Sequence, residues 1–312
     1  MGIYLNPDNK GFEQAIRSKI YVDKTGLVAC TNELLNTKER FACVSRPRRF
    51  GKSMALEMLA AYYGRGCDSR GLFAGLKIEG DSSFEEHLNQ YDVIYLNMQR
   101  FLIRAKNQDM TKYLERLVIK DLRKAYGEMF SEEETVLAAA LEQIYAETGK
   151  QFVFLIDEWD CVMRERQESE EMQKQYLDFL RDLLKDQTFV ALAYMTGILP
   201  VKKYGQHSAL NMFWEYSMTD QGFLEEYTGF TEDEVKELCN RFDMDFNQAS
   251  SWYDGYQLTK FSHIYNPKSI VEAMCRRRFL NYWTSTETYD ALKPYIDMDF
   301  DGLRTDIVKM LG

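Results

Sequence analysis

The sequence lacks any apolar run long enough to cross a membrane. Its apolar stretches, such as 189–195, reach only about seven residues, whereas a membrane-spanning helix needs about 20. The amino terminus, MGIYLN, has no cleavable apolar core, and Asn6 stands where a myristoylation signal requires Ser or Thr. We therefore expect a cytoplasmic protein with no membrane partner.

The sequence also has few prolines, no Cys-x-x-Cys pair and no excess of positive charge. The chain of 312 residues has 5 prolines, 18 glycines, 45% hydrophobic and 28% charged residues, which excludes a disordered, collagen-like or low-complexity chain. The six cysteines are scattered without a Cys-x-x-Cys pair, so reduced and mostly buried thiols are expected. The net charge of −10 excludes a surface that is basic throughout, although a local basic groove is compatible with it.

Between about residues 41 and 217, short β-rich apolar runs alternate with longer amphipathic stretches. This alternation predicts a parallel sheet covered by helices on both faces. Ser131 and Glu134 form a capping-box pattern before an apolar stripe that begins at Leu137, which predicts a helix start there. Five strands with crossovers make a doubly wound α/β core. The expected strands are 41–45, 93–98, 152–157, 189–195 and 213–218.

A largely helical unit is expected in the last part of the chain, where strand-like runs become rare. Thr231 and Glu234 form a second capping-box pattern, and Phe230 and Val235 stand at the offset of a hydrophobic staple. A further helix is expected from Ser269 onward. The expected domains are a core, 1–227, and a C-terminal unit, 228–312.

A phosphate-binding loop is the first candidate site. The expected strand 41–45 runs into RPRRFGKS at 46–53 and then into a helical stretch, which is the context that such a loop needs. Backbone N–H groups at the helix start can cradle an anion, Lys52 can reach terminal phosphate oxygens and Ser53 can ligate Mg²⁺. Arg46 replaces the first glycine of the usual pattern and is restricted to extended conformations by the proline after it. The loop therefore begins differently from the familiar one.

Two arginines in the loop have two interpretations. Arg48 and Arg49 either compensate for the missing glycine with phosphate or electrostatic contacts, or point to solvent. They belong to the candidate residues for Mg²⁺ with ATP or ADP. This nucleotide-binding set is Arg48, Arg49, Phe50, Gly51, Lys52, Ser53 and Met54.

An acidic pair follows a continuous apolar run. Residues 152–156 read as a strand buried on both faces, and Asp157 and Glu158 come directly after them. Ligand sites in open α/β sheets lie at the carboxyl ends of strands, where this pair and Lys52 both fall. Asp157 would hold Mg²⁺ together with Ser53, and Glu158 would polarise an attacking water. Either motif alone is a weak signal, but their joint occurrence favours nucleotide binding.

Other candidate residues near the site have more than one interpretation. The strand 189–195 ends at Thr196, whose hydroxyl either senses the γ-phosphate as a catalytic group or belongs to a simple turn. A cationic side chain that completes the site would raise the hydrolysis rate by about 10³–10⁵. The candidates for that role, in cis, in trans or not at all, are Arg164, Lys202 and Lys203.

Three further patterns carry little weight. The arginines 276–278 either contact nucleic-acid phosphates or form a solvated helix face. Residues 297–302 imitate the start of a calcium loop, but its twelfth position is Val308 and not Glu, so no EF-hand is expected. The three histidines are far apart in the chain and do not predict a zinc site.

The motifs resemble those of the bacterial AAA-ATPase-like family, which comprises predicted P-loop ATPases related to the STAND and archaeal-type ATPases. The resemblance covers nearly the whole chain. The missing first glycine is shared with that family, and Trp159 stands where the family more often has Tyr. The motifs are YVDKT at 21–25, SRPRRFGKS at 45–53, LIDEWD at 155–160, TGI at 196–198, GFTEDEV at 229–235, WYDGY at 252–256 and YNPKSI at 265–270.

The resemblance implies a P-loop NTPase core of the AAA, ASCE type, with Walker A and Walker B motifs, followed by a helical, winged-helix-like segment. It implies Mg²⁺-dependent ATP binding and hydrolysis that drive a conformational change in that segment. The family commonly carries a PD-(D/E)XK-type nuclease domain next, and because the sequence ends at Gly312, we expect nucleotide chemistry without strand cutting. The alternatives are a nucleotide-gated scaffold without turnover and a nucleic-acid-associated module. The sequence indicates neither a particular protein partner nor an oligomeric state.

Overall fold

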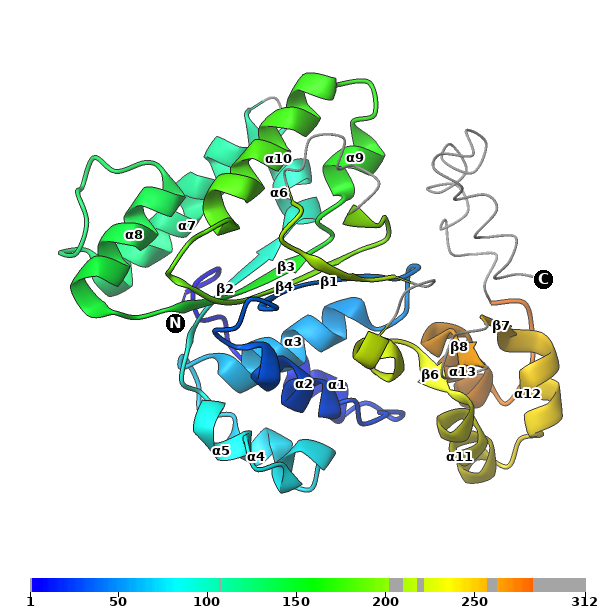
Figure 1. The fold of residues 1–312 in the computed structure, drawn as a ribbon. Helices are drawn as coiled ribbons and strands as arrows, with labels where there is room; N and C mark the ends of the chain where they lie inside the picture. The colour runs from blue at the N-terminus through cyan, green and yellow to red at the C-terminus, as the bar shows by residue number, and fades with distance from the viewer. Residues whose placement is uncertain (1, 107, 202–209, 218–221, 257–262, 283–312) are drawn as a thin grey trace.

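The computed structural model describes residues 2–106, 108–201, 210–217, 222–256 and 263–282. Its core is a five-stranded parallel sheet with helices on both faces (Figure 1). The predicted α/β fold class and all five predicted strands are confirmed. The strands are β1 (Phe41–Ser45), β2 (Asp92–Asn97), β3 (Phe152–Asp157), β4 (Val190–Gly197) and β5 (Trp214–Tyr216).

The strand order brings the predicted site residues to one edge of the sheet. The order is β2-β3-β4-β1-β5, so β4 lies between the strand that leads into the loop and the strand that ends in Asp157. Asn97 stands opposite Asp157 in the β2–β3 pair, and Val44 stands opposite Thr196 in the β1–β4 pair. Because all these strands are parallel, their carboxyl ends meet at one edge, which is where ligand sites form in such sheets.

Two layers of helices bury the sheet between them. Alternate strand residues point to opposite faces: Cys43 packs into one apolar cluster, and Ala42 and Val44 pack into the other. Each large apolar side chain that folding buries contributes about 1.5–3 kcal/mol. One layer contains α6 (Met98–Ala105), α7 (Met110–Tyr126), α8 (Leu137–Thr148), α9 (Cys161–Glu165) and α10 (Glu170–Leu184). The other contains α1 (Lys10–Ile16), α2 (Gly26–Leu34), α3 (Lys52–Tyr63), α4 (Arg70–Phe73), the 3₁₀ turn η1 (Lys77–Gly80) and α5 (Phe84–His87).

The predicted capping box at Ser131 is wrong, because α8 begins later, at Leu137. The Glu134 carboxylate accepts a hydrogen bond from the N–H of Val136 at 2.9 Å and does not reach back to Ser131. The N–H of Leu137 donates instead to the Glu115 carboxylate at 2.9 Å. A side chain from α7 thus supplies the acceptor that the sequence pattern assigned to a local cap.

Within its described residues, 222–256 and 263–282, the C-terminal part contains three α-helices and a small antiparallel sheet with the strand order β6-β8-β7. The predicted capping box of Thr231 and Glu234 is present, and Phe230 and Val235 lie in the same apolar cluster, as the staple requires. The strands were not predicted because runs of two or three residues carry no measurable alternation. The elements are η3 (Gly222–Tyr227), β6 (Phe230–Thr231), α11 (Glu232–Phe242), α12 (Phe246–Tyr253), β7 (Asp254–Tyr256), β8 (Ile264–Tyr265) and α13 (Pro267–Arg276).

The apolar cluster that contains Phe230 and Val235 also includes residues from the N-terminal part of the chain. Ile20 is buried in it, and Val22 packs against it. The division of the chain at residue 227 remains a prediction. Within the described ranges, no helix combines the length and the apolar character that crossing a membrane requires.

Candidate functional site

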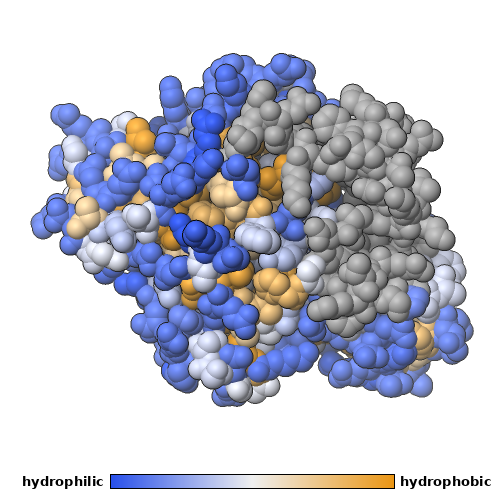
Figure 2. All heavy atoms as spheres, in the orientation of Figure 1, coloured by the Kyte–Doolittle hydropathy of each residue, from blue (hydrophilic) through white to orange (hydrophobic). Residues whose placement is uncertain are grey.

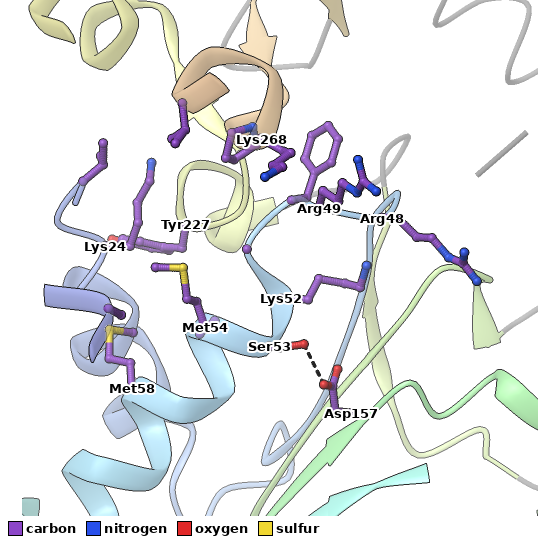
Figure 3. Close-up of a pocket in the computed structure, with 18 of the residues that line it drawn as sticks. Lys24, Arg48, Arg49, Lys52, Ser53, Met54, Met58, Asp157, Tyr227 and Lys268 are labelled. Atoms are coloured by element: carbon purple, nitrogen blue, oxygen red, sulfur yellow. Dashed lines mark hydrogen bonds between the residues drawn. The ribbon is translucent and has the colours of Figure 1, made fainter. Parts of the chain in front are cut away.

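A cavity of about 930 Å³ lies between the carboxyl edge of the sheet, α3 and the C-terminal elements (Figure 3). All seven residues of the predicted nucleotide-binding set, 48–54, line it, together with Asp157 and Glu158 from the end of β3. Tyr227 and Lys268 line it from the C-terminal side. The volume falls within the range of about 300–1,000 Å³ that is usual for small-molecule sites.

The start of the loop is held in place by the arginine that replaces the missing glycine. The Arg46 side chain is buried, and its Nη1 donates to the carbonyl of Tyr216, at the end of β5, at 3.0 Å. The Arg46 N–H donates to the carbonyl of Gly197, at the end of β4, at 3.0 Å. The arginine thus fastens the loop to the two strands on either side of β1, and its contact to β5 is one that a glycine, which has no side chain, could not make.

The helix α3 begins directly after the loop and carries Lys52 and Ser53 in its first turn. Gly51 is its N-cap residue, with φ +86°, a left-handed conformation that favours glycine. The Lys52 Nζ donates to the carbonyls of Arg46 and Pro47, each at 2.9 Å. Burial lowers the pKa of Lys52, and the carboxylates around it oppose that shift. The structure therefore places a buried cation beside the unpaired N–H groups of a helix start.

Asp157 is the centre of a hydrogen-bond network that joins three strands and a helix. The Ser53 hydroxyl donates to its Oδ2 at 2.7 Å, the contact marked in Figure 3. The Asn97 amide donates to the same oxygen at 3.1 Å, and the Thr196 hydroxyl donates to Oδ1 at 2.7 Å. Ser53 and Asp157, predicted as a pair from widely separated motifs, are therefore in direct contact.

Glu158 directly follows β3, lines the cavity and forms an ion pair with an arginine. Its backbone has φ +54°, an uncommon conformation for a residue with a side chain. Its Oε2 accepts a hydrogen bond from Nη2 of Arg164, which also contacts the buried Asp160. Burial raises the pKa of Glu158, while Lys52 and Arg164 act in the opposite direction.

The remaining candidate residues divide into three groups. Thr196 is fully buried and contacts Asp157, and Arg48 and Arg49 line the cavity. Arg276 is exposed and bonds to the Glu272 carboxylate of its own helix at 2.6 Å, as expected for a solvated helix face. Four further sequence candidates lie outside the described residues: Lys202, Lys203, His207 and the calcium-loop pattern at 297–302.

Three site residues were missed by the sequence analysis. Asn97 ends β2 and could have been found by the reasoning that identified Asp157, since both follow an apolar strand of the same sheet. Lys24 and Lys268 line the cavity from segments whose motifs suggested no chemistry. Their position depends on the packing of the C-terminal elements, which the sequence pattern did not fix.

The C-terminal elements contact the loop and the N-terminal segment directly. The N–H of Gly229 donates to the carbonyl of Phe50 at 3.1 Å, and the Asn266 amide contacts the carbonyl of Arg48 at 3.5 Å. The Nζ of Lys24 lies 2.6 Å from the Glu234 carboxylate of α11 and also donates to a carbonyl in η3. Among the described residues, the C-terminal side of the cavity is thus attached to the rest of the chain through backbone carbonyls and through the ion pair of Lys24 and Glu234.

These features together define an α/β protein of the P-loop NTPase type, with a helix-start pocket at the carboxyl edge of its sheet. Residues 10–206 match the family described as Predicted AAA-ATPase. The match covers more than half of the chain, and the chain belongs to that family. Family membership supports nucleotide binding and ATPase activity in general terms.

Two further comparisons give more distant similarities. The chain is 27% identical over 274 residues to the "Uncharacterized protein in vnfD 5'region" of Azotobacter chroococcum mcd 1, an alignment that covers 86% of this chain and 51% of that protein. This chain therefore spans about half the length of that relative. Among solved structures, AMPPCP-bound DnaA from Aquifex aeolicus is similar with 11% identity and a TM-score of 0.31, over 93% of this chain and 67% of that one.

Proposed function

We propose that this chain binds Mg²⁺ and ATP in the cavity, hydrolyses ATP, and passes the change of nucleotide state to the C-terminal elements. The observation that carries the proposal is the contact between Ser53 and Asp157 beside the buried Lys52. Their motifs lie about a hundred residues apart in the sequence. Their convergence at a helix start supports the phosphate-binding interpretation of both.

The phosphate end of ATP would lie at the start of α3. The first N–H groups of a helix have no intrahelical acceptor, and the helix dipole adds positive potential there. Lys52 would exchange its carbonyl acceptors for phosphate oxygens, which are stronger acceptors because they are charged. Arg48 and Arg49, on the same loop, are candidates for further phosphate contacts.

The residues at this point suit Mg²⁺. A serine hydroxyl and a carboxylate supply oxygen donors, and Mg²⁺ typically takes only one or two protein ligands, with water and phosphate oxygens for the rest. When bound, the ion would neutralise charge on the phosphates. Ser53 and Asp157 would hold it.

The nucleoside end of ATP would lie against the apolar part of the cavity. Met54 is 43% exposed, although it is a large apolar residue. Met58 and Tyr227 line the same region (Figure 3). Exposed apolar surface inside a concave site is typical of a surface that a ligand covers.

Glu158 is the residue we assign to the activation of water. It lines the cavity directly after the proposed metal ligand, and its carboxylate is a general base of the kind that hydrolysis requires. General-base catalysis of this type typically contributes 10²–10⁴-fold in rate. Thr196 would act through Asp157, to which its hydroxyl is bonded.

The test compares phosphate release by the wild type and by Glu158→Gln. We expect release to fall by about 10²–10⁴-fold in the variant, while Mg·ATP still raises the melting temperature of both proteins by mass action. Glu142→Gln, an exposed glutamate on α8, is the matched control and should behave as the wild type does.

The same measurement distinguishes ATP hydrolysis from the alternative, a nucleotide-gated scaffold that binds ATP without hydrolysing it. Background release from both proteins, with ATP bound, would remove the enzymatic part of the proposal and leave the scaffold. Absence of any nucleotide-dependent shift, with ATP, ADP and GTP each tested, would remove the binding part as well.

A further inference from the structure

An arginine lies behind the proposed general base. Arg164 is on α9, and its side chain is only 3% exposed. Its Nη2 donates to Oε2 of Glu158, and its Nε donates to Oδ2 of Asp160 at 3.1 Å. Glu158 lines the cavity, whereas the buried guanidinium is enclosed by these two carboxylates.

Asp160 fixes this arginine to the end of β4. Its Oδ2 also accepts hydrogen bonds from the backbone N–H groups of Ile198 and Leu199, at 3.0 and 2.8 Å. The same strand end includes Thr196, whose hydroxyl holds Asp157. One segment of chain therefore sets the position of both acidic residues, Asp157 directly and Glu158 through Asp160 and Arg164.

The backbone around Glu158 is held just as firmly. The N–H of Trp159 donates to the carbonyl of Thr196 at 3.0 Å, and the hydroxyl of Tyr176 donates to the carbonyl of Trp159 at 2.7 Å. These bonds hold Glu158 in its left-handed conformation, which is strained for an L-residue. Strain of this kind persists only where the surroundings impose it, and it concentrates at functional sites.

A glutamate held by its backbone alone would still rotate about its side-chain bonds. The planar fork of an arginine fixes the direction of a carboxylate better than a flexible point charge does. A carboxylate has two oxygens with about four acceptor sites. Engagement of Oε2 by Arg164 therefore leaves Oε1 able to accept a hydrogen bond from a water molecule.

We propose that Arg164 is a positioning residue for hydrolysis, which orients the Glu158 carboxylate toward the attacking water. This inference rests on the proposed function. It assigns Arg164 to the base and not to the γ-phosphate, because the guanidinium is buried between two carboxylates and is directed at them.

The test measures steady-state phosphate release and Mg·ATP affinity for the wild type, for four variants at Arg164 and Glu158, and for two further variants. For Arg164→Met we expect kcat to fall by about 10- to 100-fold, the typical cost of misplacing a reacting group by about 1 Å. KM and the Kd for Mg·ATP should change by less than about twofold, since no phosphate contact is lost. Arg164→Lys should restore part of kcat. In the Glu158→Gln background, Arg164→Met should cause no further loss, because the arginine acts through that carboxylate.

The control and a second variant guard against a folding defect. Arg181→Met breaks a surface ion pair with Asp178 on α10 and should leave kcat unchanged. Asp160→Asn keeps an oxygen that can accept the N–H groups of Ile198 and Leu199 but weakens the hold on Arg164. Should Arg164→Met fail to fold, a lower kcat of Asp160→Asn, without a change in Kd, supports the inference.

Three results would overturn the inference. An unchanged or raised kcat in Arg164→Met, with Glu158→Gln impaired, would refute positioning and leave the proposed function intact. An equal further loss in the Glu158→Gln background would show that Arg164 does not act through Glu158. Absence of turnover in the wild type would overturn the proposed hydrolysis and this inference together.

Discussion

The two walls of the cavity are built in different ways. On the core wall, side chains from β2, β4 and α3 all bond to one carboxylate, Asp157, and each is fixed by its own strand or helix. On the C-terminal wall, apolar residues such as Phe230 and Val271 face the cavity beside a single lysine from α13, Lys268. That wall is attached to the rest of the chain by backbone contacts to the loop, by the pair of Lys24 and Glu234, and by Ile20 and Val22, which pack into the C-terminal apolar cluster.

This difference indicates a division of labour. Groups that act on phosphate must be held to within a fraction of an ångström, which a parallel sheet and a helix start provide. The C-terminal wall is built from elements outside the parallel sheet, so we expect that it can move without disturbing that geometry, as hinge closure around a ligand requires. Gly229 lies where the two walls meet. Its φ is +93°, and an added Cβ would lie 2.4 Å from the Ile264 side chain, so this position requires glycine. The comparison therefore predicts large functional effects on the core wall and smaller ones on the C-terminal wall.

The largest effect on nucleotide binding is expected at Lys52. We expect Lys52→Met to weaken Mg·ATP binding by about 100-fold, because one or two charge-assisted hydrogen bonds of about 1.5–3 kcal/mol each are lost. Isothermal titration calorimetry measures the change. Lys120→Met, an exposed lysine on α7, is the control. Affinity within threefold of the wild type would mean that the core wall does not bind the phosphates.

Asp157→Asn tests whether the core wall also holds the metal ion. The amide has the shape of the carboxylate but lacks its charge, so we expect Mg²⁺ to add less than twofold to the ATP affinity of the variant. In the wild type, Mg²⁺ should raise the ATP affinity by about tenfold or more. Titrations with ATP in Mg²⁺ and in EDTA supply both numbers, and Asp178→Asn on the surface is the control. A variant that keeps the wild-type gain would place the ion elsewhere.

The core wall was largely predictable from sequence because its signals are local. A buried strand is a run of apolar residues, a loop with Gly-Lys-Ser at a helix start is contiguous, and the parallel sheet brings the strand ends together. Ser53 and Asp157 were paired on these grounds, and they lie 2.7 Å apart. Asn97 also ends a strand of this sheet, so the same strand-end argument applies to it, although a single amide at a strand end is not a recognised motif.

The C-terminal wall was not predictable, since its contacts join segments about 200 residues apart. The partner of Lys24 is Glu234, a residue that the sequence assigned only to a cap. The Glu234 carboxylate makes both contacts, since it also accepts a hydrogen bond from the N–H of Thr231 at 2.8 Å. In the same way, nothing in the pattern RPRRFGKS indicated that Arg46 would be buried against β5.

The smallest functional effect is expected at the pair of Lys24 and Glu234. Lys24→Met removes a hydrogen bond between charged, largely buried groups, so the amides of α11 should exchange about 10- to 100-fold faster, corresponding to about 1.5–3 kcal/mol of local stability. The Kd for Mg·ATP should rise by less than about fivefold, because the core wall is intact. Glu234→Gln, combined with Lys24→Met, should add little to the exchange rate of the single variant, since the two side chains share one interaction. Lys236→Met, an exposed lysine on the same helix whose ion pairs lie at the surface, is the control. A loss of affinity as large as that of Lys52→Met would show that both walls hold the nucleotide equally, and the division of labour between them would have to be abandoned.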